Sequence, residues 1–148
     1  MKYSLLALFS SCALSLCSNA NIVELKWCVA NNSSVPLFDI KFNYMFPVSA
    51  EQVVPVEMGS VAQVDKGITR CVTFEYPLQL ATQNKIEGKS NADIIVKATI
   101  FHVDFQNKGY ISPINCPDIV VSTTNKTISV TGTAEPGAKF GCEVTSPD

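Results

Sequence analysis

The chain has little charge, a single histidine and no hydrophobic run long enough to cross a bilayer. Asp, Glu, Lys and Arg together make up 16% of its 148 residues. A membrane-spanning helix needs roughly 20 predominantly apolar residues, and the apolar run from Leu5 to Leu16 is shorter and interrupted by Ser10 and Ser11. Basic residues are scattered singly from Lys26 to Lys139. This scatter argues against a footprint for nucleic acid or an anionic membrane.

Motifs of several enzyme and metal-site classes are also missing. No C-x-x-C spacing is present and the only histidine is His102, so a zinc site is not expected. No Gly-x-Ser-x-Gly nucleophile elbow occurs either. His102 and Asp104 lie two residues apart in a predicted strand and so share a face, as a general base oriented by a carboxylate would. The simpler interpretation places both on the solvent side, and we expect no catalytic residue, cofactor or metal.

Residues 1–20 have the pattern of a cleavable secretory signal peptide. Lys2 precedes the apolar run, which ends at Ser18-Asn19-Ala20 with small residues where signal peptidase cleaves. An alternative is lipidation at Cys12 or Cys17. A leucine precedes Cys17 where a small residue is required, and Cys12 would leave too short a hydrophobic segment. We therefore expect an exported protein, secreted or periplasmic, and the short Met-Lys opening favours a bacterial source.

The mature chain, residues 21–148, is the size of one domain. Removing Lys2 with the signal peptide leaves 10 basic residues against 13 acidic ones, a net charge of about −3. Val, Ile, Thr and Ser are abundant, which favours pleated sheet over helix.

Two segments alternate in polarity with the period of a strand. Val23, Leu25, Trp27 and Val29 share one face of the first, and Asn31-Asn32-Ser33-Ser34 is expected to end it. The second has Phe38, Ile40, Phe42, Tyr44 and Phe46 on one predicted core face. About eight short strands separated by Gly and Pro turns predict an all-β fold, an immunoglobulin-like antiparallel β-sandwich, with a small closed β-barrel as the alternative.

Two connections are the candidate contact surfaces. One is the polar stretch from Gln83 to Asn91, and the other runs from Pro47 to Met58. In the second, Pro55 among Val53, Val54 and Val56 restricts the segment to an edge strand or an extended loop. Its valines and Met58 either leave apolar surface exposed or pack as an irregular edge on the core.

Four cysteines remain after cleavage of the signal peptide: Cys28, Cys71, Cys116 and Cys142. An even number in an exported chain indicates two disulfides, with three possible connectivities. Cys28 and Cys71 both lie on the polar face of their strands, so if they pair they are neighbours on the outside of one sheet. We expect Cys28 to pair with Cys71 and Cys116 with Cys142, each bridge contributing about 3 to 4 kcal/mol in the loop-entropy estimate.

Asn31, Asn32 and Asn125 each begin an Asn-x-Ser/Thr sequon. In a eukaryotic protein, glycans there would mark the solvent face. In a bacterial protein these residues would serve only to favour turns of the chain.

One tetrapeptide, Ile114-Asn115-Cys116-Pro117, is similar to a stretch of the secreted MD-2-related lipid-recognition domains. These are also small disulfide-bonded β-sandwiches, so the resemblance implies a lipid-holding sandwich. It covers four residues. The family's second, closely spaced cysteine is missing from the ten residues before Cys116. Cys142 also follows Cys116 too soon for the strands that would lie between them in that family.

The sequence therefore predicts an exported, non-catalytic binding or structural module that engages a protein or glycan partner. Three alternatives stand beside it: a small secreted hydrolase using His102 and Asp104, a lipid-binding β-sandwich, and an inhibitor of a secreted enzyme. Neither a nucleic-acid partner nor a membrane span is expected.

Overall fold

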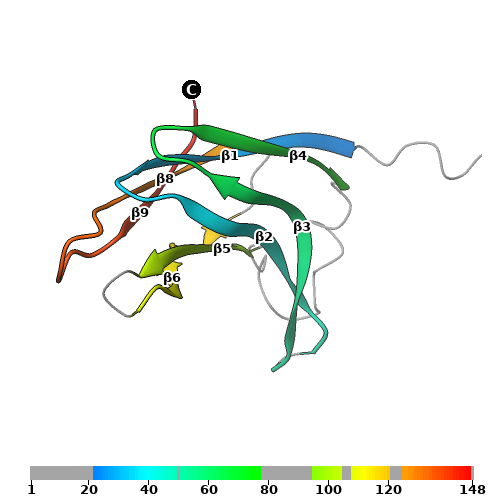
Figure 1. Ribbon diagram of the computed structural model, residues 1–148. Coiled ribbons are helices and arrows are strands. Elements are labelled where there is room, and N and C mark those ends of the chain that lie inside the picture. The colour runs from blue at the N-terminus through cyan, green and yellow to red at the C-terminus, as the bar shows by residue number, and fades with distance from the viewer. Residues whose placement is uncertain (1–21, 50, 78–94, 105–107, 121–124, 148) are drawn as a thin grey trace, which may run out of the picture.

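A computed structural model describes residues 22–49, 51–77, 95–104, 108–120 and 125–147. The predicted signal peptide lies outside these residues, so its cleavage stays a prediction. The described residues form nine strands (Figure 1). In chain order they are β1 (Ile22–Ser33), β2 (Leu37–Pro47), β3 (Val53–Val64), β4 (Thr69–Pro77), β5 (Ile95–Asp104), β6 (Tyr110–Asn115), β7 (Ile119–Val120), β8 (Lys126–Gly132) and β9 (Gly141–Thr145).

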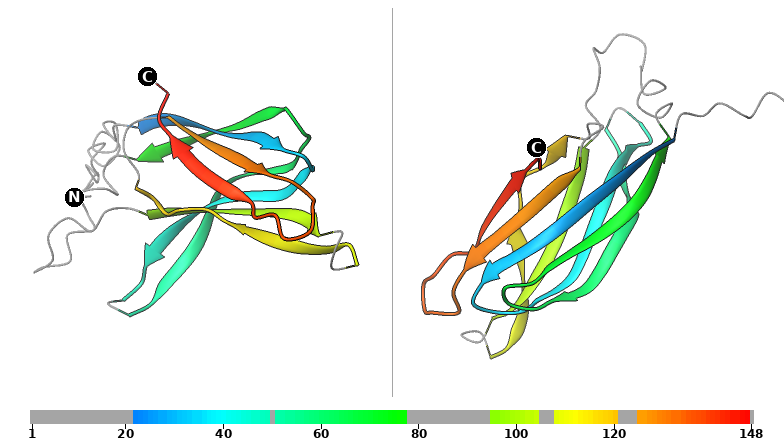
Figure 2. Two further views of the ribbon diagram at one scale, coloured as in Figure 1. Left: turned by 90° about the vertical axis from the view of Figure 1, so that its left-hand side faces the viewer. Right: turned by 90° about the horizontal axis from the view of Figure 1, so that it is seen from above.

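The strands build two sheets that pack face to face (Figure 2). One sheet has the order β4-β1-β8-β9, and the other has the order β3-β2-β5-β6, with β7 also pairing with β5. The predicted all-β sandwich is confirmed, and the closed-barrel alternative is wrong for the described part of the chain.

One pair of strands departs from the predicted antiparallel arrangement. β1 and β8 run parallel, with Trp27 opposite Lys126 and Ser33 opposite Gly132. Parallel neighbours need a long crossover connection rather than a hairpin, and six strands intervene between these two in the sequence. The antiparallel prediction holds for the other neighbouring pairs in the two sheets, including β1–β4 and β2–β5, which no hairpin joins.

The core is centred on β1. Leu25, Trp27 and Val29 are buried, as their alternation predicts. The Trp27 ring packs edge-on against Phe42 of the opposite sheet, with centroids 5.6 Å apart, and against Phe74 of β4 at 5.3 Å. Large aromatic groups packed in this way supply much of a small domain's stability.

The predicted core face of β2 is correct in its middle and wrong at its two ends. Ile40, Phe42 and Tyr44 are buried. Phe38 is only partly buried, because a register shift between Phe38 and Lys41 reverses the phase of the strand. The cause is a bulge with a backbone φ of 45° at Asp39, which lets Leu37 take the core position instead. Phe46 lies beyond the end of the sandwich and is exposed.

The stretch from Asn31 to Ser34 does end the first strand, but only at its third residue, and it does not lie wholly at the surface. β1 continues to Ser33, and both Asn31 and Ser33 are buried. The Asn31 amide Nδ2 donates to the carbonyl oxygens of Val35 at 2.8 Å and of Val64 at 2.9 Å. Internal hydrogen bonds therefore satisfy a polar side chain on the core face, and the Asn31 sequon does not lie on the solvent face. Asn32 and Asn125 are exposed.

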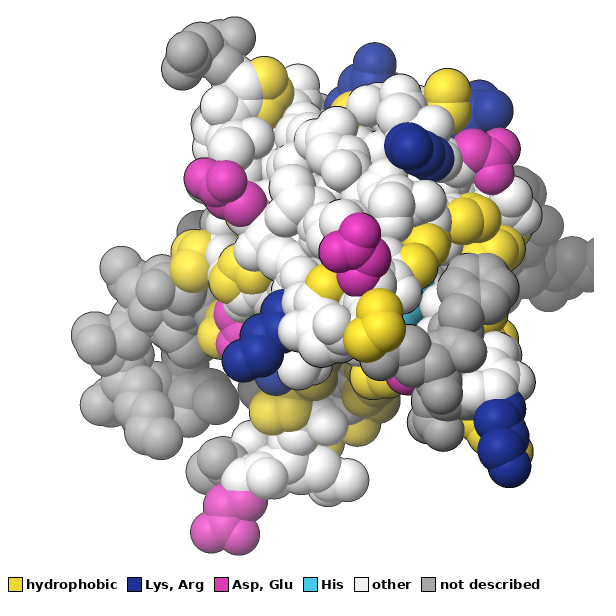
Figure 3. All heavy atoms as spheres, turned by 60° about the vertical axis from the view of Figure 1, so that its left-hand side comes forward, with side chains coloured by type: hydrophobic (Ala, Val, Ile, Leu, Met, Phe, Trp, Pro, Cys, Tyr) yellow, Lys and Arg dark blue, Asp and Glu magenta, His cyan; other side chains and the backbone are white. Residues whose placement is uncertain are grey.

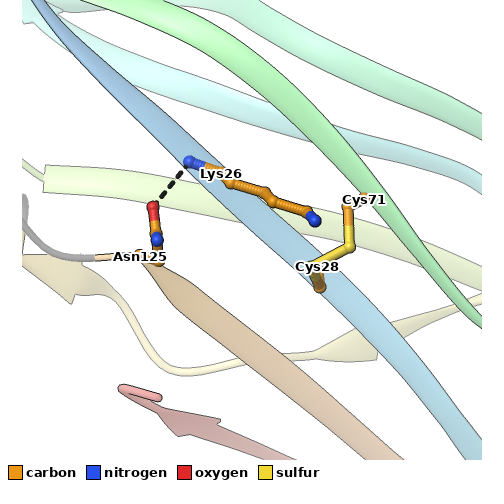
Figure 4. The surroundings of a disulfide bond; sticks show 4 residues. All are labelled: Lys26, Cys28, Cys71 and Asn125. Carbon is orange, nitrogen blue, oxygen red and sulfur yellow. Dashed lines mark hydrogen bonds between the residues drawn. A yellow bond between two sulfur atoms is a disulfide. The ribbon is translucent and has the colours of Figure 1, made fainter. Parts of the chain in front are cut away.

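Both predicted disulfides are present. Cys28 and Cys71 are directly opposite each other on β1 and β4, on the outer face of that sheet (Figure 4). Beside the bridge, the backbone N–H of Lys26 donates to Asn125 Oδ1 at 2.8 Å. The second bond joins Cys116, just after β6, to Cys142 on β9. It therefore ties the two sheets together along one edge of the sandwich.

Candidate functional site

The structure places His102 and Asp104 on the inner face of their sheet, not on the solvent side as the simpler interpretation had it. They follow the buried Ile100 at two-residue intervals, and His102 lies opposite the buried Leu37 of β2. Both side chains are partly buried. The sequence pattern misleads here because polar residues can occupy the inner face where the sandwich opens at its end.

A pocket of about 240 Å³ lies beside these residues. β5 contributes His102, Val103 and Asp104 to its walls. The connection between β8 and β9 contributes the others, among them Thr133 and Glu135. The volume is slightly below the range typical of small-molecule sites.

The imidazole of His102 is held by an aromatic stack. Its ring lies 4.0 Å from that of Phe140, centroid to centroid, at an interplanar angle of 29°. The Nδ1 atom lies 3.2 Å from the carbonyl oxygen of Val103. A Cβ atom on Gly132 would lie 2.8 Å from Phe140 Cδ1, so that glycine allows the Phe140 ring its close approach.

The pocket therefore brings an imidazole, two carboxylates and a hydroxyl to one end of the sandwich. Sequence reasoning missed Thr133 and Glu135, because they come from a different connection and carry no motif that links them to His102. Among the described residues, no group of three His, Cys, Asp or Glu side chains could hold a metal ion.

A second feature is the hairpin that β2 and β3 form beyond the body of the sandwich (Figures 1 and 2). The pairing of β2 with β5 reaches Tyr44, opposite Val96. Farther out, residues 45–47 of β2 pair with residues 53–55 of β3 and form a two-stranded extension. Val56 and Glu57 lie at the root of this extension. We call residues 45–49 and 51–57 the β2–β3 ribbon.

The tip of the ribbon is closed by a hydrogen-bonded turn. The backbone N–H groups of Val48 and Ser49 donate to the carbonyl oxygen of Gln52 at 2.9 and 3.2 Å. The N–H of Gln52 donates back to Ser49 Oγ at 3.1 Å. These bonds hold the two strands of the ribbon in register.

The side chains of the ribbon are apolar and exposed. Their exposed fractions are 37% for Phe46, 50% for Val48, 49% for Val53, 40% for Val54 and 48% for Val56. Neighbouring residues of a strand point to opposite faces, so the exposure of both Val53 and Val54 means that neither face packs fully on the sandwich. Figure 3 shows hydrophobic side chains toward the base of this lower protrusion and an acidic side chain at its end.

One ribbon face continues the core. Along β2, exposure rises from 0% at Phe42 to 6% at Tyr44 and 37% at Phe46 on the same face. The rings of Tyr44 and Phe46 still contact each other edge-on, 5.9 Å apart. The inner face of this sheet thus extends past the strands that cover it.

The predicted edge position of the Pro47–Met58 segment is correct, although its strand is longer than expected. β3 is a single edge strand of 12 residues, paired only with β2 within its sheet. A register shift at Met58, between the pairs Phe42–Gly59 and Asn43–Glu57, marks a bulge. Met58 packs partly buried against the core, while the valines beyond it do not. The other predicted contact surface, Gln83 to Asn91, lies outside the described residues.

No helix in the described part of the chain has the length and apolar character needed to cross a membrane.

Fold and site together define a small, disulfide-bonded β-sandwich with a projecting apolar ribbon. No protein-family model and no curated protein sequence matches the chain.

Among solved structures, the chain is similar to listeriolysin O, with 12% identity and a TM-score of 0.46 over 82% of this chain and 22% of that one. It is also similar to a non-hemolytic pneumolysin from Streptococcus pneumoniae strain ST306, with 9% identity and a TM-score of 0.45 over 84% of this chain and 24% of that one.

A third similar structure is the membrane-binding domain of pneumolysin, with 11% identity and a TM-score of 0.44 over 84% of this chain and 99% of that one. The chain spans about a quarter of the length of the whole toxins it matches. At these scores and identities the likeness carries no inference about function.

Proposed function

We propose that this protein is an exported, non-catalytic binding module that engages a protein partner through the β2–β3 ribbon. The observation that carries the proposal is the exposure of the ribbon's apolar side chains on both faces. Contiguous exposed apolar surface on a soluble protein is typical of an interaction site.

The export part of the proposal rests on two features. The predicted signal peptide directs the chain out of the cytoplasm, and the two disulfides suit an oxidising compartment. The bridges also stiffen the sandwich that carries the ribbon. A rigid body presenting a small apolar projection loses little conformational freedom on binding.

A protein partner fits this surface better than a glycan does. Val48, Val53, Val54 and Val56 offer branched aliphatic groups with few polar atoms. Burial of such groups in an apolar recess contributes roughly 25 cal/mol per Å² removed from water. A sugar, which is rich in hydroxyl groups, would find few hydrogen-bond partners among them.

The test replaces apolar surface while keeping side-chain shape. In the variant V53T/V54T/V56T, threonine preserves β-branching and adds a hydroxyl group at each site. The control variant I68T/I111T/V120T replaces three exposed aliphatic side chains outside the ribbon by threonine. Each form, recovered after export, is immobilised and exposed to the extracellular or periplasmic fluid of its source.

We expect the wild type and the control to retain the same protein, and the ribbon variant to lose it. Retention by all three forms would contradict the proposal, because binding would then not depend on the ribbon. An inhibitor of a secreted enzyme is a special case, recognised when the retained protein is an enzyme that loses activity in the complex.

A small hydrolase is the second candidate, favoured by the pocket beside His102. With Nδ1–H donating to the Val103 carbonyl, Nε2 would be free to accept a proton from a water or a hydroxyl group. If this function is correct, His102→Ala abolishes the exported hydrolytic activity that is lost on deletion of the gene. Unchanged activity in the variant would remove the hydrolase from consideration.

A further inference from the structure

We infer that the ribbon is recognised by a protein whose apolar recess is bordered by Lys or Arg side chains, and that it docks through side chains rather than as an added strand. This inference rests on the proposed function, since it names the chemistry of the partner for the same surface. The charges on the ribbon, the ion pairs at its root and the proline on its edge support it.

The charge of the ribbon has one sign. Glu51 and Glu57 are both exposed, one at the tip and one on β3. No Lys or Arg occurs anywhere in residues 42–65, and Asp65 adds a third carboxylate at the end of that stretch. Within this stretch of sequence the exposed valines are therefore flanked by negative groups alone. Complementary charge on a partner steers association and excludes wrong partners.

Within the part of the chain that the structure describes, two basic side chains on the strands at the root of the ribbon are paired with carboxylates. Lys41, on β2, lies 3.3 Å from Asp39. Lys97, opposite Asn43 on β5, lies 3.6 Å from Asp118. These exposed pairs add little to stability, but they leave the negative charge of the ribbon uncompensated by these two lysines.

The same charge argues against two other occupants. A second copy docked ribbon to ribbon would bring Glu51 and Glu57 of both molecules together, and like charges in contact oppose association. An anionic membrane surface would repel the ribbon for the same reason, since such surfaces attract basic segments. A basic rim on a protein partner suffers neither penalty.

Pro55 argues against strand addition at the β3 edge. It lies on the edge strand, opposite Met45 of β2. Proline has no N–H group, and in an edge strand its nitrogen faces solvent. A partner strand added along the β3 edge of the ribbon would therefore find one of the expected donors missing. Recognition through the valine side chains needs no such donor.

The experiment reverses charge at the rim. The protein retained in the capture described above is titrated with wild type, with E51K/E57K and with the control E24K/E143K, which makes the same change in net charge at exposed positions of the other sheet. We expect the rim variant to bind about tenfold more weakly and the control to bind within about twofold of wild type. Wild-type affinity should also fall as salt is raised from about 50 to about 300 mM.

Failure of the inference is distinct from failure of the proposed function. If V53T/V54T/V56T loses binding while E51K/E57K keeps wild-type affinity, the ribbon is the site and the basic rim is wrong. If both variants bind as wild type does, the ribbon is not the site. If Pro55→Val, which restores the N–H, strengthens binding tenfold or more, docking by strand addition replaces docking by side chains.

Two further measurements test the other occupants. Flotation with vesicles of phosphatidylcholine, with and without phosphatidylserine, tests for a bilayer, and sedimentation of the protein alone tests for a second copy. We expect no co-flotation and no ribbon-dependent dimer. Either result, if abolished by the ribbon variant and not by the control, would overturn the inference of a basic protein partner.

Discussion

Removal of the buried Asn31 amide is expected to cost much of the stability of the fold. Its Nδ2 group donates to two backbone carbonyls, and its Oδ1 accepts from the backbone N–H of Ser33 at 3.0 Å and from Ser33 Oγ at 2.6 Å. Backbone atoms of Asn31 also bond to the β3–β4 turn, at Gly67 and Ile68. One residue thus joins the end of β1 to the loop after it, to the end of β3 and to that turn.

The magnitude follows from the side-chain bonds that Asn31→Ala would remove. Four bonds at a net value of about 1 kcal/mol each give a loss of about 4 kcal/mol. The backbone bonds of residue 31 are retained in the variant, so the estimate counts the amide group alone. A loss of this size is a large part of the 5 to 15 kcal/mol typical of a whole domain.

Its neighbour Asn32 supplies the matched control. The Asn32 amide is exposed and makes one hydrogen bond, to Ser129 Oγ at 2.9 Å, so Asn32→Ala should cost about 1 kcal/mol or less. Urea unfolding of the two variants measures the difference. With a slope of about 2 kcal/mol per molar, Asn31→Ala should lower the midpoint by about 2 M. Equal midpoints for the two variants would refute the idea that this network anchors the end of the sandwich.

Two more substitutions test how the fold is held. Replacing both Cys28 and Cys71 by Ala should lower the free energy of unfolding by about 4 kcal/mol, because the bridge closes a loop of 43 residues; a loss under about 1 kcal/mol in urea unfolding would contradict this. Gly132→Ala should lower the melting temperature more than Gly137→Ala does. Both glycines have positive φ, but a Cβ at 132 would lie 2.8 Å from the Phe140 ring and one at 137 meets nothing within 4 Å. Equal losses of melting temperature in the two variants would mean that the position of the Phe140 ring does not depend on the absence of a side chain at residue 132.

Much of the fold could be predicted from the sequence because strand periodicity reports which side chains share a face. The buried face of β1 and the outer position of Cys28 and Cys71 follow from a two-residue count. The same count failed at Phe38. A bulge at Asp39 adds one residue to the strand and reverses its phase, and no residue type in that stretch marks it in advance.

Side-chain polarity alone also gave wrong predictions for residues at the ends of strands. Asn31 and Ser33 belong to residue types that favour turns, yet they remain in a strand because they satisfy each other and nearby carbonyls. The pocket beside His102 could not be predicted, since Glu135 comes from a connection more than 30 residues away in the chain. Such sites depend on how the two sheets overlap at their ends, and local patterns do not contain that information.

The ribbon shows the same limit of prediction from local sequence patterns, and in the ribbon this limit concerns the proposed binding surface. Alternation correctly assigns Phe46 to the face of Phe42 and Tyr44, but it does not report where the covering sheet stops. Strand propensity does not require valine beyond that point, because threonine is also β-branched and suits exposed strand positions. This chain uses threonine in that way at positions 69, 73 and 131. Valine at 53, 54 and 56 keeps 40 to 49% of its surface exposed after folding, so the free energy of burying that remainder is available to a partner.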